Sequence, residues 1–213
     1  MRADLGWQAL QWPAMEHVIA RLTPDGFRAD GRIVLAEGKL TSVRYTLECD
    51  PDWQVRRVSV VQDAASGRQA LELTSDAAGH WAVDGSVRPD LDGCTDIDIS
   101  QTPLTNTLPI RRLPWLPGQQ RDLAVVYVRL PELTAEPVAQ RYTLLSRDAI
   151  SGDAVYRYES GTFCADLPAD ADGFVVDYPG LWRRLAAPSR ARPARQFSPN
   201  TASRANCRPK NAW

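Results

Sequence analysis

Polar and apolar residues alternate with a period of two along most of the chain, the pattern of strands with one buried face. The clearest case is the pair of segments 27–35 and 43–49, which the turn Glu37-Gly38-Lys39 joins into a predicted β-hairpin. With these two, the pattern predicts about a dozen strands, the others being 16–22, 53–62, 69–74, 80–83, 94–99, 122–130, 138–145, 155–159, 162–167 and 174–178.

Helical periodicity is nearly absent. The best helical candidate is a turn or two within 104–113, and Pro109 limits even that. Strands that follow one another without a crossover helix pair antiparallel, and a dozen strands are too many for one flat sheet. We therefore expect a mainly β domain: one strongly curved antiparallel sheet, a half-barrel, around a few short helical segments. A two-sheet sandwich is the alternative.

The composition changes near residue 187. Residues 1–187 carry the strand pattern, whereas 188–213 are rich in Pro, Ser and Arg and lack apolar periodicity. Such a segment buries too little surface to offset the entropy of ordering. We expect one curved β domain over 1–187 and a disordered basic tail over 188–213.

Charge is distributed unevenly along the chain. The formal net charge is −1, yet residues 178–213 contain eight basic residues and no acid, so the rest of the chain is acidic. An acidic body argues against nucleic acid as a partner, because phosphate binding needs a cationic face. Lys39 and Lys210 are the only lysines among 25 basic residues, a bias that favours a GC-rich bacterial genome.

The four cysteines, Cys49, Cys94, Cys164 and Cys207, are widely spaced and form no C-x-x-C motif. The first eleven residues lack the apolar run of a signal peptide, and no stretch reaches the roughly 18 apolar residues of a membrane span. These features predict a cytoplasmic protein with four free thiols and no transmembrane segment. The sequence does not specify an oligomeric state.

Motifs for common catalytic chemistry are missing. The chain has no nucleophile elbow, phosphate loop, dinucleotide fingerprint or zinc-protease motif, so no cofactor and no metal is expected. His17 and His80 lie 63 positions apart, and their spacing indicates no shared site. We interpret both as partly exposed strand residues.

Asp96 and Asp98 are more suggestive, because alternate residues of a strand share one face. Two carboxylates roughly 6.5–7 Å apart along a strand can form an acid/base pair or a cation site. The alternative is a solvent-facing strand, or ion pairs with Arg111 and Arg112. If the face points into a cavity, the acids must be paired or neutralised.

Residues 100–113 form the least generic stretch of the chain. Thr105 and Asn106 can hydrogen-bond backbone or sugar hydroxyls, and Arg111 and Arg112 can hold a carboxylate or phosphate. The alternative is a rigid connector whose arginines pair with the two acids. Because adjacent residues point to different sides, we expect one arginine to face the sheet and the other to face solvent or a ligand.

Aromatic residues gather in the second half of the chain and include Tyr127, Tyr142 and Tyr178. Aromatic side chains on strands mostly fill a core. A curved sheet lined with them is also how a cavity for an apolar ligand is built, and the three tyrosines are candidate ligand contacts for that reason.

Four stretches together carry a family resemblance: Cys94-Thr-Asp-Ile-Asp98, the run from Thr102 to Arg112, Gln140-Arg-Tyr142 and Asp177-Tyr-Pro-Gly180. With them the chain resembles a bacterial glycolipid-binding family, long catalogued as a domain of unknown function, over about residues 10–185. The resemblance implies a curved antiparallel sheet partly closed around short helical segments. That fold is similar to lipoprotein carriers, and the resemblance implies no catalytic residues.

The leading interpretation is non-enzymatic binding of a lipid or glycolipid in the concave face of the curved sheet. Thr105, Asn106, Arg111 and Arg112 would contact the polar head. One alternative is a hydrolase acting on a sugar or lipid ester with Asp96 and Asp98 as acid and base. Another is a protein-interaction scaffold without a ligand. An open cavity would separate the first two from the third.

Overall fold

Two β-sheets and the short helical segments between them make up the described part of the chain. The computed structural model describes residues 1–36, 38, 40–76 and 78–185. The expected tail at 188–213 lies outside the described residues. The mainly β, mainly antiparallel architecture is confirmed, with fifteen strands in the described ranges.

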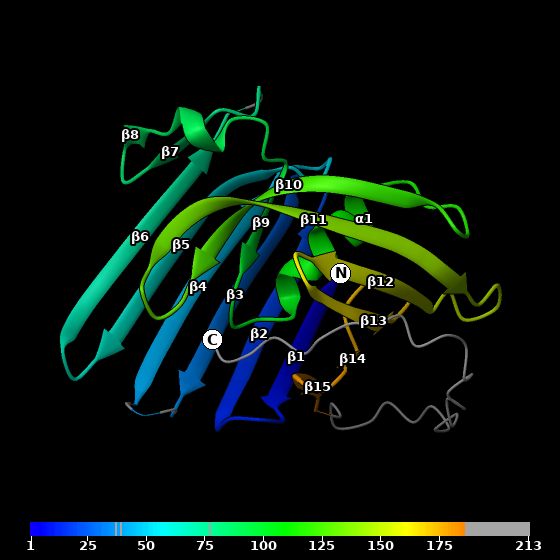
Figure 1. Cartoon of the computed structure of the whole chain (residues 1–213), viewed down its shortest axis with the longest axis horizontal. Coiled ribbons are helices and arrows are strands. Elements are labelled where there is room, and N and C mark those ends of the chain that lie inside the picture. The colour runs from blue at the N-terminus through cyan, green and yellow to red at the C-terminus, as the bar shows by residue number, and fades with distance from the viewer. Residues whose placement is uncertain (37, 39, 77, 186–213) are drawn as a thin grey trace.

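The large sheet has ten strands in the order β14-β15-β1-β2-β3-β4-β5-β6-β7-β8, and all neighbours pair antiparallel (Figure 1). The bounds are β1 (Arg2–Ala9), β2 (Ala14–Thr23), β3 (Gly26–Leu35), β4 (Thr41–Cys49), β5 (Val55–Ala64), β6 (Gly67–Ser75), β7 (Trp81–Val83), β8 (Ser86–Val87), β14 (Asp177–Tyr178) and β15 (Trp182–Arg184). Short turns join the strands from β1 to β8, so this part is a meander.

The small sheet has five strands in the order β13-β12-β11-β10-β9. Its strands are β9 (Asp96–Ile99), β10 (Gln120–Arg129), β11 (Thr134–Arg147), β12 (Ala154–Ser160) and β13 (Phe163–Ala169). A 3-10 turn, η1 (Pro89–Leu91), precedes β9, and η2 (Leu104–Asn106) and α1 (Thr107–Arg112) follow it. The long connection from β9 to β10 permits their parallel pairing, the one exception to the antiparallel pattern in the described residues.

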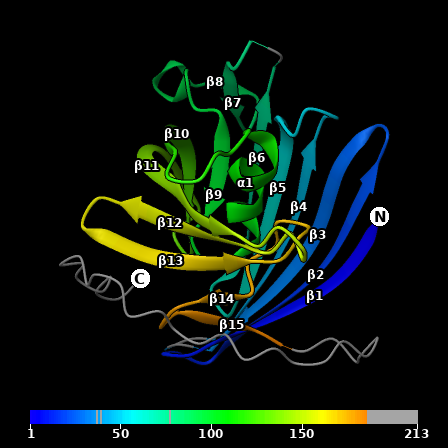
Figure 2. The same cartoon turned by 90° about the vertical axis from the view of Figure 1, so that its right-hand side faces the viewer.

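One part of the fold prediction was wrong: the strands form two separate sheets and not a single curved one. In Figure 2 the large sheet curves around α1, and the small sheet covers the helix from the other side. The helical segments at 104–112 were predicted correctly. Alternation alone does not reveal which strands are partners, so it could not separate one sheet from two.

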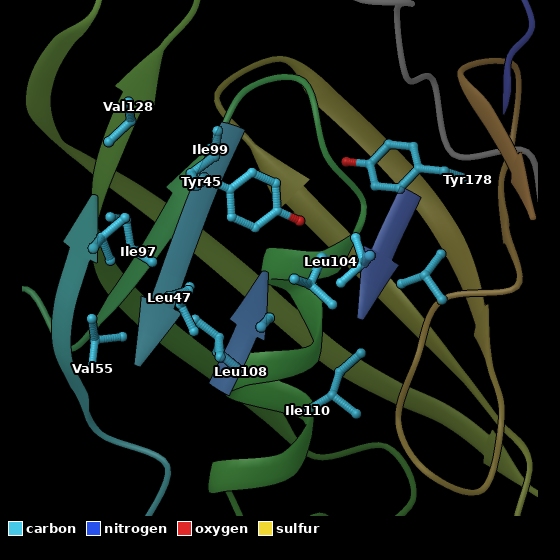
Figure 3. Packing of buried hydrophobic residues seen from close by; sticks show 14 of the residues in the cluster. Tyr45, Leu47, Val55, Ile97, Ile99, Leu104, Leu108, Ile110, Val128 and Tyr178 are labelled. Carbon is cyan, nitrogen blue, oxygen red and sulfur yellow. The ribbon is translucent and has the colours of Figure 1, made fainter. Parts of the chain in front are cut away.

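The concave face of the large sheet is filled. Leu104 and Leu108 have no exposed surface, Ile110 is only 6% exposed, and all three pack among side chains from both sheets (Figure 3). Leu47 of β4 and Ile97 of β9 belong to the same buried cluster. The inserted helical segments therefore occupy the place where the sequence-based interpretation put an acyl chain.

The cysteine prediction was partly wrong. Cys49 and Cys94 are free and buried. Cys164 is disulfide-bonded, which contradicts the expectation of four free thiols. Cys207 lies outside the described residues.

Gly31 of β3 stands directly opposite Tyr45 of β4, and the tyrosine ring lies across the glycine. A Cβ on Gly31 would come within 2.0 Å of the ring and 2.5 Å of the hydroxyl oxygen of Tyr45. The missing side chain lets the ring cross β3, so that the hydroxyl reaches Glu16 on β2 at 2.6 Å.

We expect Gly31→Ala to lower the free energy of unfolding by about 1–3 kcal/mol, because the methyl group displaces the Tyr45 ring. Gly6→Ala is the matched control: its Cβ would meet no atom closer than 3.5 Å, so its effect should be small. Urea unfolding of both variants measures the difference. Equal losses in the two variants would contradict the steric role of Gly31.

Candidate functional site

The inserted segment, residues 100–112, leaves β9 and runs between the sheets, with every residue from 100 to 110 buried. Because buried polar groups need hydrogen-bond partners, two of its hydroxyls accept backbone N–H groups nearby. Ser100 Oγ accepts the N–H of Leu130 at 2.9 Å, and Thr102 Oγ1 accepts the N–H of Leu104 at 2.9 Å. The second bond starts the helical turn η2.

Glu16 of β2 links the large sheet to the inserted segment. Its carboxyl group accepts the hydroxyl of Tyr45 at 2.6 Å and that of Thr102 at 2.8 Å, and the residue is 2% exposed. Burial raises the pKa of Glu16 from 4.5 to about 8, although the two hydrogen bonds act in the opposite direction. At neutral pH the side chain is therefore mainly a neutral acid.

Asp96 is fully buried and paired with Arg112. The guanidinium donates from Nε at 3.2 Å and from Nη2 at 2.5 Å, and the hydroxyl of Thr95 donates to the same carboxylate at 2.8 Å. The Arg112 side chain is only 15% exposed. Arg112 is thus the inward arginine of the adjacent pair, which confirms the expectation that the two arginines diverge.

Asp98 has different partners from Asp96. It accepts hydrogen bonds from Gln140 Nε2 at 2.6 Å, Thr105 Oγ1 at 3.1 Å and the hydroxyl of Tyr158 at 3.4 Å. The residue is partly exposed. The two aspartates share a strand but sit in separate hydrogen-bond networks.

Four tyrosines surround Asp98: Tyr127, Tyr142, Tyr158 and Tyr178. Burial is the main reason that the pKa of each phenol is raised, and the charge of Asp98 adds to the effect in all four. The rings of Tyr142 and Tyr158 meet edge-on at 5.2 Å. All four phenols therefore stay protonated and can donate hydrogen bonds.

A small cavity opens beside this cluster. Its volume is about 20 Å³, and its walls include Asp98, Asn106, Tyr158 and Tyr178. Asn106 Oδ1 accepts the hydroxyl of Tyr142 at 2.8 Å, so its carbonyl group is already engaged. A cavity of this size holds one water molecule and is far too small for a sugar ring.

A larger and more open cavity lies on the other side of α1, with a volume of about 220 Å³. We call it the arginine cavity. Arg111 and Arg147 lie in its wall beside the aromatic rings of Trp115 and Tyr156, which meet at 5.2 Å. The other residues in its wall are Ile110, Leu113, Pro114, Gly152, Ala154, Asp170, Ala171 and Gly173.

The two guanidiniums of the arginine cavity have different aromatic partners. Arg147 donates to the Tyr156 hydroxyl at 2.8 Å, and Arg111 lies 5.1 Å from the centre of the Trp53 ring. Burial raises the pKa of Tyr156, and the charges of Arg147 and Arg111 oppose that rise. Neither arginine has a carboxylate partner within the described part of the chain.

Among the described residues in the wall of this cavity Asp170 is the one acid, and its charge is already compensated. Its carboxylate accepts Arg184 Nη1 at 2.7 Å and the N–H groups of Asp172 and Phe174 at 3.1 and 2.9 Å. The arginine cavity is therefore cationic, with aromatic rings beside the charges. This chemistry suits a phosphate or carboxylate carried on a ring or a short polar group.

The predicted site residues separate into two groups. Eight of them, Asp96, Asp98, Thr105, Asn106, Arg112, Tyr127, Tyr142 and Tyr178, belong to the buried polar cluster around β9 and η2. Arg111 alone lies in the wall of the arginine cavity. His17 and His80 are more than half exposed and pair with Asp4 and Asp76, remote from both cavities.

Sequence reasoning did not select Glu16, Tyr158, Trp115, Arg147 or Tyr156 as site residues. Glu16 carried a usable signal, because it is an acid at an inward position of an alternating strand, between Ala14 and Val18. The other four lie on strands or loops where nothing in the local pattern marks them. Only the pairing of β11 with β12 brings Arg147 to Tyr156.

Two further observations concern metals and membranes. Among the described residues no three His, Cys, Asp or Glu side chains are grouped so that they could hold a metal ion. No helix in the described ranges is long and apolar enough to cross a membrane.

Comparison with known proteins gives one family and several similar structures. The family model described as "Putative glycolipid-binding" matches residues 4–184. A crystal structure of a DUF1089 family protein from Pseudomonas aeruginosa is 34% identical, with a TM-score of 0.73 over 84% of this chain and 95% of that one. No curated protein matches the sequence.

A second solved structure is similar in fold alone. It is a β-barrel-like protein of the domain of unknown function DUF1849 from Brucella abortus, 11% identical, with a TM-score of 0.51. The match covers 86% of this chain and 93% of that one. At this sequence identity the similarity shows a shared arrangement of strands and says nothing about a shared ligand.

Arg112→Ala should lower the free energy of unfolding by about 3–5 kcal/mol, because it leaves the charge of Asp96 buried without a partner. Arg111→Ala should lower the free energy of unfolding by about 1 kcal/mol or less, since it removes only the contact of the guanidinium with an aromatic ring. Urea unfolding compares the two. Adding Asp96→Asn to Arg112→Ala should recover part of the loss, and no recovery would argue against the buried charge as its cause.

Glu16→Gln should remove a pH-dependent loss of stability. Because the folded-state pKa of Glu16 is raised to about 8, its neutral form is favoured by folding, and stability falls as pH rises from 4.5 toward 8. The free energy of unfolding of Glu16→Gln minus that of the native chain should grow by several kcal/mol between about pH 5 and about pH 9. A difference that does not change with pH would contradict the raised pKa.

Proposed function

This chain belongs to the glycolipid-binding family, whose model matches residues 4–184, and on that basis we propose that it binds a lipid or glycolipid without transforming it. The polar head group lies in the arginine cavity. The observation that carries the proposal is the pair of exposed guanidiniums, Arg111 and Arg147, beside Trp115 and Tyr156 in an open cavity.

The chemistry of the cavity fits such a head group. A guanidinium binds phosphate or carboxylate oxygens through two parallel hydrogen bonds, and an aromatic face packs against the C–H groups of a sugar. The cavity volume of about 220 Å³ lies below the roughly 300 Å³ at which sites for larger ligands begin. It therefore suits a head group, and an acyl chain would extend outside it.

The proposal moves the head group from the place that the sequence suggested. Thr105 is 2% exposed and donates a hydrogen bond to Asp98. Asn106 is 6% exposed and is hydrogen-bonded to Pro103 and Tyr142. Arg112 is held by Asp96. Of the four residues first assigned to the head group, Arg111 is the one that reaches the arginine cavity.

Hydrolysis by Asp96 and Asp98 is a weaker proposal. A carboxylate pair that acts on a glycosidic or ester bond must face a space that admits the substrate. Asp96 has no exposed surface, and Asp98 borders a cavity of only about 20 Å³. These two observations favour binding over catalysis.

Lipid retention tests the proposal. Native mass spectrometry of the purified protein should show co-purified lipid, and Arg111→Ala and Arg147→Ala should each weaken binding about tenfold or more, as expected for a lost hydrogen bond to a charged group. Arg141→Ala is the matched control, because Arg141 is exposed on β11 and pairs with Asp122. Its lipid content should stay unchanged.

Two outcomes would contradict the proposal. If the native chain carries no lipid and takes up none from a defined lipid mixture, the scaffold interpretation replaces it. If Arg141→Ala loses as much lipid as Arg111→Ala and Arg147→Ala, the retention depends on total charge and not on the arginine cavity.

A further inference from the structure

Two exposed apolar residues are close in the chain to residues in the wall of the arginine cavity. Leu116 is 68% exposed and follows Trp115, and Ile150 is 96% exposed in the loop between β11 and β12. Arg147 and Gly152, which lie in the cavity wall, belong to the same loop region as Ile150. Leu145 of β11 is also exposed, at 38%.

The two loops are fixed against each other near β11. The N–H of Gly118 donates to the carbonyl oxygen of Leu144 at 2.8 Å, and the N–H of Leu144 donates to that of Gln119 at 3.2 Å. The start of β10 therefore lies beside the end of β11, which the register of Gln120 opposite Thr143 also shows. The segments before β10 and after β11, which carry Leu116 and Ile150, thus begin and end at the same end of the small sheet. The end of β11 is on the right in Figure 1.

The turn that carries Ile150 is ordered by hydrogen bonds. Asp148 Oδ1 accepts the N–H groups of Ile150 and Ser151 at 2.8 and 2.7 Å, and the Asp148 carbonyl accepts the N–H of Gly152 at 2.9 Å. The isoleucine is held at the tip of a structured turn, with almost its whole side chain in contact with solvent.

A single exposed apolar residue is common on protein surfaces and needs no explanation. Two exposed apolar residues near two guanidiniums that have no carboxylate partner among the described residues do need one. Arg111 and Arg147 form no ion pair with a carboxylate in the described ranges, and the two exposed apolar residues are close in the chain to wall residues of the same cavity. Apolar side chains that enter the head-group region, next to cations that meet lipid phosphates, are the two features by which proteins attach to an anionic membrane surface.

We propose that the mouth of the arginine cavity docks on a lipid bilayer that contains anionic head groups. Ile150 and Leu116 enter the boundary between head groups and acyl chains, and Arg111 and Arg147 contact lipid phosphate. The inference rests on the proposed function, since it names the bilayer as the surface from which the ligand enters the cavity. Two isolated tips and a charged cavity fit a bilayer better than a protein partner, which would need a contiguous apolar patch.

Sedimentation with vesicles tests the docking. Vesicles of phosphatidylglycerol and phosphatidylcholine should bind the native chain, and vesicles of phosphatidylcholine alone should bind it much more weakly. Ile150→Asp and Leu116→Asp should each reduce binding about tenfold or more, because each loses the burial of an apolar side chain. Arg111→Ala and Arg147→Ala should each reduce it about fivefold.

Val87→Asp is the matched control. Val87 is 72% exposed on β8, at the opposite end of the molecule in Figure 1, and its replacement should leave vesicle binding unchanged. Equal binding to the two kinds of vesicle would overturn the proposal. So would an Ile150→Asp variant that binds as well as the native chain, or a Val87→Asp variant that binds as poorly as Ile150→Asp.

A soluble probe separates this inference from the proposed function. Dihexanoyl phosphatidylglycerol, used as monomers below its micelle concentration, should bind the native chain and Ile150→Asp alike, but not Arg111→Ala. Binding of the monomer without binding of vesicles would overturn the docking while the proposed function stands. Loss of monomer binding in Ile150→Asp would assign Ile150 to the ligand site and also overturn the docking. Failure of the native chain to bind either probe would count against both proposals.

Discussion

The burial of a polar segment between two sheets is the constraint on which the rest of this structure depends. The inserted segment covers the concave face of the large sheet, and its hydroxyl and amide groups must find partners there. Thr102 and Asn106 find them in Glu16 and Tyr142, one on each sheet. Gln101 Oε1 and Thr107 Oγ1 of the same segment have no hydrogen-bond partner among the described residues. Most, but not all, of the buried polar atoms of the segment are therefore hydrogen-bonded.

This filling decides where a ligand can be accommodated. A half-barrel with an empty concave face would take an acyl chain inside, whereas here Leu104 and Leu108 occupy that space. The arginine cavity lies outside this filled interior, with the end of α1 and the end of β11 in its wall. The helix that closes the interior thus also builds the arginine cavity, because its last turn sends Arg112 inward to Asp96 and Arg111 outward to the cavity wall.

The buried cluster and the open cavity use charge in different ways. In the cluster each acid is compensated in its own way: Asp96 is paired with a guanidinium, Glu16 retains its proton, and Asp98 accepts three hydrogen bonds. In the cavity, two guanidiniums keep their charge exposed. Buried charges without partners destabilise a fold, whereas exposed ones are free to meet a ligand, so the cavity is the better candidate for binding.

The sequence by itself determined the local features of this protein. Alternation located most strands, and the Leu104–Leu113 region was identified as the helical one. An ion pair between one of the two aspartates and one of the two arginines was among the alternatives that the sequence left open, and the structure has it between Asp96 and Arg112. Only the tertiary structure decided that the strands divide into two sheets and that Arg147 meets Tyr156. The physical reason is that a period of two specifies which face of a strand is buried, but not which strand lies beside it. Contacts between distant strands depend on how the whole chain packs.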